Sequence, residues 1–329
     1  MDGARQHEIA NALNLDLWTS TIKVPGRIDM RVTPHDKKNF ESLVRNIELR
    51  GTRLNWELLH EDLGEAIEQE RAANEAAQAA AGGFFDSYAN YTQMMEFLTQ
   101  LQATYPSFTY VANQWQCPRD GWRGLTDALS ALSLSFSRVG MCRSIVNVGT
   151  TIEGRAINGI VISGNASPNA TKPAIVINGC QHAREWISPM TVAYIAQALC
   201  TNYTTDPNVK QIVDSFEITV IPIVNADGYV YTQTERLWRK NRRINANSSC
   251  IGVDLNRNWD YEWGLPSGSS PLPCSDTYHG TAGFSEPEET SVAKYISSKV
   301  QSITNTHTSL TLSLSLSVVI QWRVTRRLD

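Results

Sequence analysis

The chain lacks any long apolar run, and its first residues are polar. No stretch of about 18 consecutive apolar residues occurs, so the sequence predicts no membrane-spanning helix. The opening MDGARQHEIA has no apolar core of the kind that a secretory signal peptide carries. Positively charged residues are also fewer than negatively charged ones: 29 Lys and Arg residues against 33 Asp and Glu residues give a net charge of −4. That balance disfavours nucleic-acid binding as the main function.

What the chain does contain is the composition of a globular protein. Hydrophobic residues make up 42% and charged residues 19%, which excludes wholesale disorder. At roughly 150 residues per domain, the length predicts about two domains. The six cysteines are compatible with disulfides. Five Asn-x-Ser/Thr sequons favour secretion, and they stand at Asn90, Asn165, Asn169, Asn202 and Asn247.

The first part of the chain has the pattern of a small separate unit. LDLWTS and RIDMRV are typical of strands, and HDKKNFESLVRNI repeats apolar residues with a helical period. EDLGEAIEQERAANEAAQAAA predicts a charged, Ala-rich helix that ends at Gly82-Gly83. We therefore expect a small α+β sandwich over residues 1–81 and a second domain over 82–329.

The second domain alternates buried strands with helices. INGIVIS, PAIVINGC and FEITVIPIVN are apolar and β-branched, and SPMTVAYIAQALC is helical in pattern. This alternation predicts an α/β fold with a mixed, mostly parallel sheet flanked by helices, whose ligand sites lie at the carboxyl ends of the strands. SEPEETSVAKYISS predicts another helix, opened by a capping box between Ser285 and Glu288.

Two Ser/Leu-biased runs do not fit this alternation. SALSLSFS lies within residues 110–143 and SLTLSLSLS lies within 303–329. A period of two suits an edge strand, but low complexity explains it equally. We expect both segments to be foreign to the fold.

The sharpest chemical signal is the motif His182-Ala183-Arg184-Glu185-Trp186, between a buried strand and a helix. A His and a Glu three residues apart can aim a ring nitrogen and a carboxylate oxygen at one Zn²⁺. For an isolated His and Glu at this spacing, a salt bridge within the loop is the commoner explanation.

Two further stretches, ERLWRKNRR and GVDLNRNWD, add guanidinium forks that bind carboxylates bidentately, although each alone is typical of a solvated loop or turn. Together they suit cleavage at the C-terminal end of a peptide.

The order of the motifs resembles that of a known family. HAREW, VNADGY, ERLWRKNRR, CIGVDLNRNWD, PCSDTYHG and SEPE follow one another as in the zinc metallocarboxypeptidases of the carboxypeptidase A/B family, over about residues 145–300. Residues 7–75, with LDLW, RIDMRV and HEDLGEAIEQE, resemble the inhibitory pro-segment of that family, a ferredoxin-like α+β sandwich that covers the active-site cleft. The resemblance implies a secreted, monomeric zymogen with one Zn²⁺ that hydrolyses the C-terminal bond of peptides and proteins.

The functional residues of the family can be assigned to this sequence wherever a motif matches. The resemblance implies His182 and Glu185 as zinc ligands and Arg239 as the group that polarises the scissile carbonyl and stabilises the oxyanion. It implies a disulfide between Cys250 and Cys274. It assigns substrate contacts to Arg184, Arg236, Asn256 and Arg257.

The family pattern continues beyond the SEPE helix in a way that this sequence does not follow. It supplies a third zinc-ligand His, a substrate-capping Tyr and a general-base Glu, and no such motif precedes Asp329. His307 stands at about the right distance, but its setting does not match, and we expect an exposed loop His. We therefore expect a truncated carboxypeptidase-like chain, inactive as written, with translated introns in the two Ser/Leu-biased segments and the first pro-segment strand missing.

Two other functions stay open from the sequence. A catalytically dead pseudo-peptidase would bind C-terminal carboxylates through Arg239, Asn256 and Arg257, and an intracellular scaffold would explain the missing signal peptide. The expected partners are peptide or protein C-termini and the chain's own pro-segment, with no nucleic acid and no membrane. The side-chain preference stays open, as do the cleavage point near 71–83 and the pairing of the four other cysteines, Cys117, Cys142, Cys180 and Cys200.

Overall fold

The computed structural model describes most of the two predicted domains. The described residues are 16–17, 30–49, 58–80, 82–105, 109–110, 146–164, 172–265, 268–304 and 312–316. Several predictions lie outside them: the segment 111–143 with Cys117 and Cys142, the sequons at Asn165 and Asn169, and His307.

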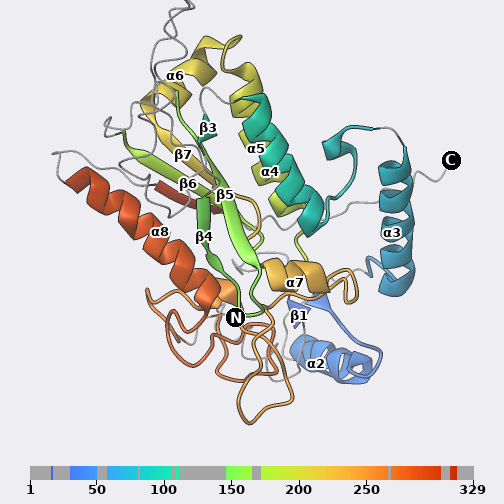
Figure 1. Ribbon diagram of the computed structural model, residues 1–329. Coiled ribbons are helices and arrows are strands. Elements are labelled where there is room, and N and C mark those ends of the chain that lie inside the picture. Colours follow the sequence, from blue (N-terminus) through green and yellow to red (C-terminus); the bar gives the residue numbers. More distant parts are fainter. Residues whose placement is uncertain are drawn as a thin grey trace, which may run out of the picture.

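A six-stranded mixed sheet forms the centre of the second domain (Figure 1). Its strands are β3 (Thr109–Tyr110), β4 (Val146–Thr150), β5 (Ala156–Ile162), β6 (Ala174–Gly179), β7 (Glu217–Ile221) and β8 (Leu312–Leu316). The order is β3-β5-β7-β6-β8, with β4 also paired to β5. β5 runs antiparallel to β3, β4 and β7, whereas β6 is parallel to both β7 and β8. The mixed sheet expected from the sequence is confirmed, but among the described strands antiparallel pairs outnumber parallel ones by three to two, so the expectation of a mostly parallel sheet is wrong. A short turn joins β4 to β5, and strands joined in this way pair antiparallel.

Helices cover both faces of this sheet. On one face α4 (Tyr91–Thr104), α5 (Ile187–Asn202) and α6 (Pro207–Ser215) share a core with apolar side chains of β5 and β7. On the other face α8 (Pro287–Thr304) packs against β4 and β6 (Figure 1). The central strands between these layers are mostly apolar, as sheets buried on both faces require, and their fully buried side chains include Ile157, Ile160, Val161, Ile162, Val176, Val220 and Ile221. None of the described helices combines the length and the apolar character needed to cross a bilayer.

Part of the Ser/Leu-biased tail joins the sheet. β8 pairs with β6 so that Ser315 lies opposite Asn178 and Leu316 opposite Gly179, at the carboxyl end of β6. The alternation LSLSL is compatible with a strand. Residues 312–316 thus belong to an element of the fold in this structure, although the sequence favours placing the whole of 303–329 outside it.

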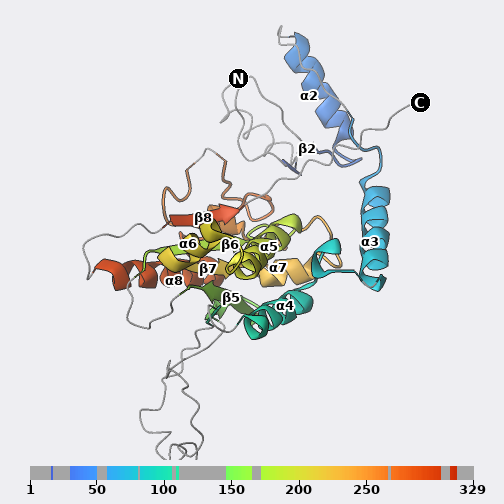
Figure 2. The ribbon, with the colours of Figure 1, turned by 90° about the horizontal axis from the view of Figure 1, so that it is seen from above.

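The N-terminal residues are described in pieces. β1 (Asp16–Leu17) pairs antiparallel with β2 (Met30–Arg31), and α2 (Lys37–Leu49) and α3 (Leu63–Ala79) follow. Asp62 caps α3 by accepting hydrogen bonds from the amides of Gly64 and Glu65. No residue of α3 is buried, and Figures 1 and 2 show it set apart from the helix layers of the sheet. The 3₁₀ turn η1 (Phe84–Asp86) then leads into α4.

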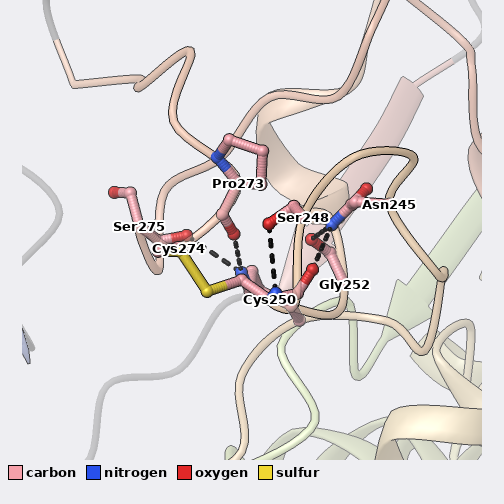
Figure 3. The surroundings of a disulfide bond; sticks show 8 residues. Asn245, Ser248, Cys250, Gly252, Pro273, Cys274 and Ser275 are labelled. Atoms are coloured by element: carbon pink, nitrogen blue, oxygen red, sulfur yellow. Dashed lines mark hydrogen bonds between the residues drawn. A yellow bond between two sulfur atoms is a disulfide. The ribbon is translucent and has the colours of Figure 1, made fainter.

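The disulfide implied by the family resemblance is confirmed. Cys250 and Cys274 are bonded, with their Cα atoms 5.0 Å apart and 24 residues between them in sequence (Figure 3). The bond joins two loop segments of the second domain. Cys180 and Cys200 are free and buried, so they do not pair with each other.

Removing this disulfide is expected to lower the free energy of unfolding by about 3 kcal/mol, because the crosslink restricts the unfolded chain. The double variant Cys250→Ser/Cys274→Ser, compared with the wild type in denaturant unfolding, measures the loss. Mild reduction of the wild type provides the control, since it breaks the same bond without a substitution. A double variant that unfolds at the wild-type denaturant concentration would contradict this expectation.

Candidate metal and substrate site

The HAREW motif occupies the loop between the carboxyl end of β6 and the start of α5. This loop is held closely against its neighbours: a Cβ at Gly179 would lie 2.9 Å from the carbonyl oxygen of Pro222. The Asn225 side-chain amide donates to the carbonyl of Gln181 at 3.0 Å, and the amide of Ala183 donates to the carbonyl of Arg239 at 3.0 Å. The HAREW and LWRK loops are therefore fixed to each other by backbone contacts.

His182 and Glu185 converge, as the sequence predicts. His182 Nδ1 lies 2.8 Å from Glu185 Oε1, and their side chains are 3% and 11% exposed. A ring nitrogen and a carboxylate oxygen are donors that Zn²⁺ accepts. Among the described residues there is no group of three or more His, Cys, Asp or Glu side chains that could hold a metal ion. This part of the chain thus brings together two groups of the kinds that Zn²⁺ accepts, and no third.

Asp254 is the site residue that the sequence interpretation missed. Its Oδ1 lies 3.1 Å from His182 Nε2, and its Oδ2 accepts from Arg239 Nη2 at 2.8 Å and from Nε at 3.2 Å. Asp254 is fully buried. Carboxylates that hold the second nitrogen of a metal-ligating His are a recurrent feature of metal sites. The available signal was the acidic residue that precedes Leu-Asn-Arg in the GVDLNRNWD motif.

The charge of Asp254 fixes the role of one His182 nitrogen, Nε2. Burial alone would raise the pKa of Asp254, but the charges of Arg239 and His182 outweigh it and hold the pKa well below its usual range. An ionised carboxylate only accepts hydrogen bonds, so His182 Nε2 carries a proton toward Asp254. Nδ1 faces a second carboxylate, that of Glu185, and either a proton or a metal cation held by these two groups would satisfy both.

Arg184 and Arg236 flank the HAREW loop. Arg184 is buried, with Nη1 3.5 Å from Asp276 Oδ2. Arg236 donates through Nη1 to the carbonyl of Arg184 at 2.8 Å and stacks over the Trp186 ring at 3.9 Å. Its Nε and Nη2 bind both carboxylate oxygens of Glu70, at 2.6 and 3.0 Å. A carboxylate of α3 therefore occupies the bidentate face of Arg236.

Asn256 and Arg257 lie on the 3₁₀ turn η2 (Leu255–Arg257), directly after Asp254. The amide of Asn256 donates to Asp254 Oδ1 at 3.0 Å. Arg257 donates through Nε to the carbonyl of Gly268 at 2.5 Å and through Nη1 to the carbonyl of Asn256 at 3.1 Å. The structure thus brings His182, Glu185 and Arg239 together through Asp254, while the recorded hydrogen bonds of Arg257 point to backbone carbonyls.

Three buried carboxyl groups stand at the start of α8, behind the site. Glu286 binds Arg243 Nε at 2.6 Å and Asn241 Nδ2 at 2.7 Å. The capping box predicted between Ser285 and Glu288 is not formed; Glu288 accepts instead from the amide of Ile152 at 3.0 Å. Burial raises the pKa of Glu288 to about 7.

Glu289 is the third of these carboxyl groups. It is fully buried, and neither of its carboxylate oxygens has a hydrogen-bond partner. Burial, reinforced by the charges of Glu288 and Asp254, raises its pKa well above the usual range.

A polar cavity separates α3 from the second domain. Its volume is about 370 Å³, and it is lined by side chains from α3, from residues 88–90 just before α4 and from the loops around Trp186 and Arg236. The amide group of Asn74 both donates to the carbonyl and accepts from the amide of Tyr88, at 3.2 and 2.6 Å. Gln78 donates to the same carbonyl at 2.9 Å. Polar contacts therefore hold α3 in place.

Family models match both parts of the chain. The model described as zinc carboxypeptidase matches residues 137–326, and the model described as carboxypeptidase activation peptide matches residues 7–70. Metallocarboxypeptidase A of Trichophyton tonsurans is 35% identical over 275 residues, which are 83% of this chain and 55% of that protein. Carboxypeptidase A2 of Rattus norvegicus is 30% identical over 309 residues, which are 92% of this chain and 63% of that protein. The chain thus spans about half the length of the fungal relative.

Solved structures show the same architecture. Carboxypeptidase A from Helicoverpa armigera superposes with a TM-score of 0.70 at 27% identity, over 91% of this chain and 64% of that chain. Thrombin activatable fibrinolysis inhibitor superposes with a TM-score of 0.65 over 94% of this chain and 67% of that chain, and at 21% identity this likeness concerns the fold alone.

Proposed function

The chain belongs to the zinc carboxypeptidase family, and on that premise we propose that it is the zymogen of a zinc-dependent metallocarboxypeptidase that removes residues from the C-termini of peptides and proteins. The observation that carries this proposal is the chain of contacts from Glu185 through His182 and Asp254 to Arg239. This chain of contacts supports the proposal because it gathers an imidazole, a second carboxylate and a buried guanidinium near Asp254.

His182 and Glu185 would hold the zinc ion, together with a ligand outside the described residues. When bound, zinc lowers the pKa of a coordinated water toward about 7 and polarises a carbonyl group. Asp254 supports this role by accepting the Nε2 proton of His182, which keeps the Nδ1 lone pair available. The same carboxylate orients Arg239, whose charge would stabilise an oxyanion in a site with little water.

The arginines around the site suit a substrate that ends in a carboxylate. We assign the terminal carboxylate to Asn256 and Arg257, because a guanidinium fork and an amide match its two oxygens. Arg184 and Arg236 would contact the peptide further from its end. Arg257 would have to exchange its contact with the carbonyl of Gly268 for the substrate.

The pro-segment would act as the chain's own inhibitor. The ion pair between Glu70 and Arg236 supports this role, since it occupies a group that we assign to the substrate. The disulfide and the sequons support secretion, because disulfides persist in oxidising compartments. We propose a secreted monomer.

Metal binding tests the proposal without depending on turnover. Titration of the chelator-treated protein with zinc is expected to show one site in the wild type, lost in His182→Ala and in Glu185→Gln. His60→Ala provides a matched control, because this exposed histidine precedes α3 and is expected to leave zinc binding unchanged. Failure of the wild type to bind zinc would contradict the proposed metal site.

Peptide hydrolysis then separates the enzyme from the pseudo-peptidase. If the protein is an enzyme, we expect it to release the C-terminal residue from an N-terminally blocked peptide once the pro-segment is removed. A chelator is expected to stop this release. Peptide binding that needs Arg257, resists chelator and leads to no release would instead favour a carboxylate-binding protein.

A further inference from the structure

Asn247 stands at the tip of a short, firmly held loop. An antiparallel bridge between Ile244 and Ile251 closes the loop. Inside it, the buried Asn245 donates through Nδ2 to the carbonyls of Cys250 and Gly252, at 3.0 and 3.1 Å (Figure 3). The base of the loop is thereby tied to the disulfide, and its tip is left facing solvent.

The side chain of Asn247 does not stabilise the loop through a hydrogen bond to any of the described residues. It is exposed, and it makes no hydrogen bond with any of them. Its φ of 58° lies in the left-handed region, which asparagine tolerates better than most residues. The neighbouring Asn245 differs in each respect, because it is buried and hydrogen-bonded.

The residues that follow complete an acceptor sequence. Asn247-Ser248-Ser249 is an Asn-x-Ser sequon, and its hydroxyl residue Ser249 is exposed like Asn247. The middle residue, Ser248, turns its Oγ inward and accepts from the amide of Cys250 at 3.1 Å (Figure 3). Both groups that define the sequon are thus accessible, while its middle residue belongs to the loop.

Exposed apolar side chains lie on the two segments that the disulfide joins. Ile244 is 82% exposed, three residues before Asn247, and Leu272 is 61% exposed, two residues before Cys274. Covering apolar surface of this kind removes it from water, which is favourable. A bulky, solubilising sugar chain on the same loop would provide such a cover.

We propose that Asn247 carries an N-linked glycan that shields Ile244 and Leu272. In the reaction, Asn247 Nδ2 attacks C1 of a lipid-linked diphospho-oligosaccharide; the new N–C bond forms, the C1–O bond to the diphosphate breaks, and the amide loses one proton. The proposal rests on the secretion proposed above, since both the disulfide and this modification belong to the secretory route.

The sequon at Asn90 offers a contrast. Asn90 caps α4 by accepting from the amide of Gln93 at 3.0 Å, and it lines the cavity beneath α3. Asn90 is exposed, as Asn247 is, so a sugar chain there would stand beside α3. Asn247, by contrast, caps none of the described helices.

Peptide mapping of the full chain, made in a eukaryotic host behind a secretory leader, tests the proposal. The Asn247 peptide is expected to carry a glycan that an amidase removes with conversion of Asn247 to Asp. Asn247→Gln and Ser249→Ala are each expected to lose one glycan. Ser248→Ala keeps the sequon and provides the matched control, which is expected to keep the glycan.

Two results would overturn the proposal. An unmodified Asn247 peptide in a protein with glycans at Asn202 or Asn90 would reject this site but not the proposed secretion. The absence of glycans at every sequon would count against both the glycan at Asn247 and secretion. Shielding has its own readout: Asn247→Gln is expected to self-associate more than the wild type, and adding Ile244→Ser and Leu272→Ser is expected to reverse this. Unchanged self-association in Asn247→Gln would reject the shielding role.

Discussion

An Asp254→Asn substitution is expected to lower the free energy of unfolding by about 3–5 kcal/mol, the usual cost of breaking a buried ion pair from one side. Asp254 is fully buried, and Arg239 is only 8% exposed. The variant keeps the volume of the side chain but removes the only carboxylate that is hydrogen-bonded to the buried Arg239 guanidinium among the described residues. Denaturant unfolding measures the loss.

A second Asp→Asn substitution serves as a control, because it makes the same exchange of side chain at a site with no buried ion pair. Asp206 caps α6 by accepting hydrogen bonds from the amides of Asn208 and Val209. Asparagine caps helices about as well as aspartate, so Asp206→Asn is expected to change the stability by only a few tenths of a kcal/mol. Equal losses in the two variants would contradict the assignment of Asp254 as the charge that holds Arg239.

The second large effect is a loss of stability on going from acidic to neutral pH. The pKa of Glu288 rises from 4.5 to about 7 in the folded protein, chiefly because of burial. The folded state therefore binds this proton more tightly than the unfolded state does. The stabilisation is fully present below pH 4.5 and is lost as the pH rises through about 7. A shift of this size corresponds to about 3 kcal/mol.

Glu288→Gln is expected to remove this share of the pH dependence, because glutamine resembles the protonated acid and does not titrate. Unfolding free energies of the two proteins at about pH 5 and about pH 8 measure the difference. Some dependence of the same sign is expected to remain, since burial also raises the pKa of the neighbouring Glu289. A variant with the same slope as the wild type would show that Glu288 does not titrate in this range.

The pairing of His182 with Glu185 could be predicted because it is local. Both residues lie in one loop between a strand and a helix, and the apolar, β-branched strand fixes where that loop begins. The same reasoning correctly predicted a sheet with helices on both faces, but not its antiparallel pairs. Sequence patterns are informative at this range, since helix and strand periods decide which side chains share a face.

Contacts across long sequence separations could not be predicted in this way. Asp254 meets His182 across 72 residues, and Glu70 meets Arg236 across 166. The charges of α3 have the pattern of a solvated helix, and nothing in that pattern identifies which carboxylate docks. Glu288 is another example: the sequence pattern predicted a hydrogen bond with nearby Ser285, whereas its carboxylate accepts from the amide of Ile152, in a turn far away in the sequence.

The manner in which α3 is held has a calorimetric consequence. No residue of this helix is buried, and its contacts with the second domain run through Glu70, Asn74 and Gln78. The heat capacity of a protein rises on opening mainly when apolar surface meets water. Detachment of α3 would therefore leave the heat capacity almost unchanged, whereas melting of the sheet would raise it steeply, so the two events carry distinct thermal signatures.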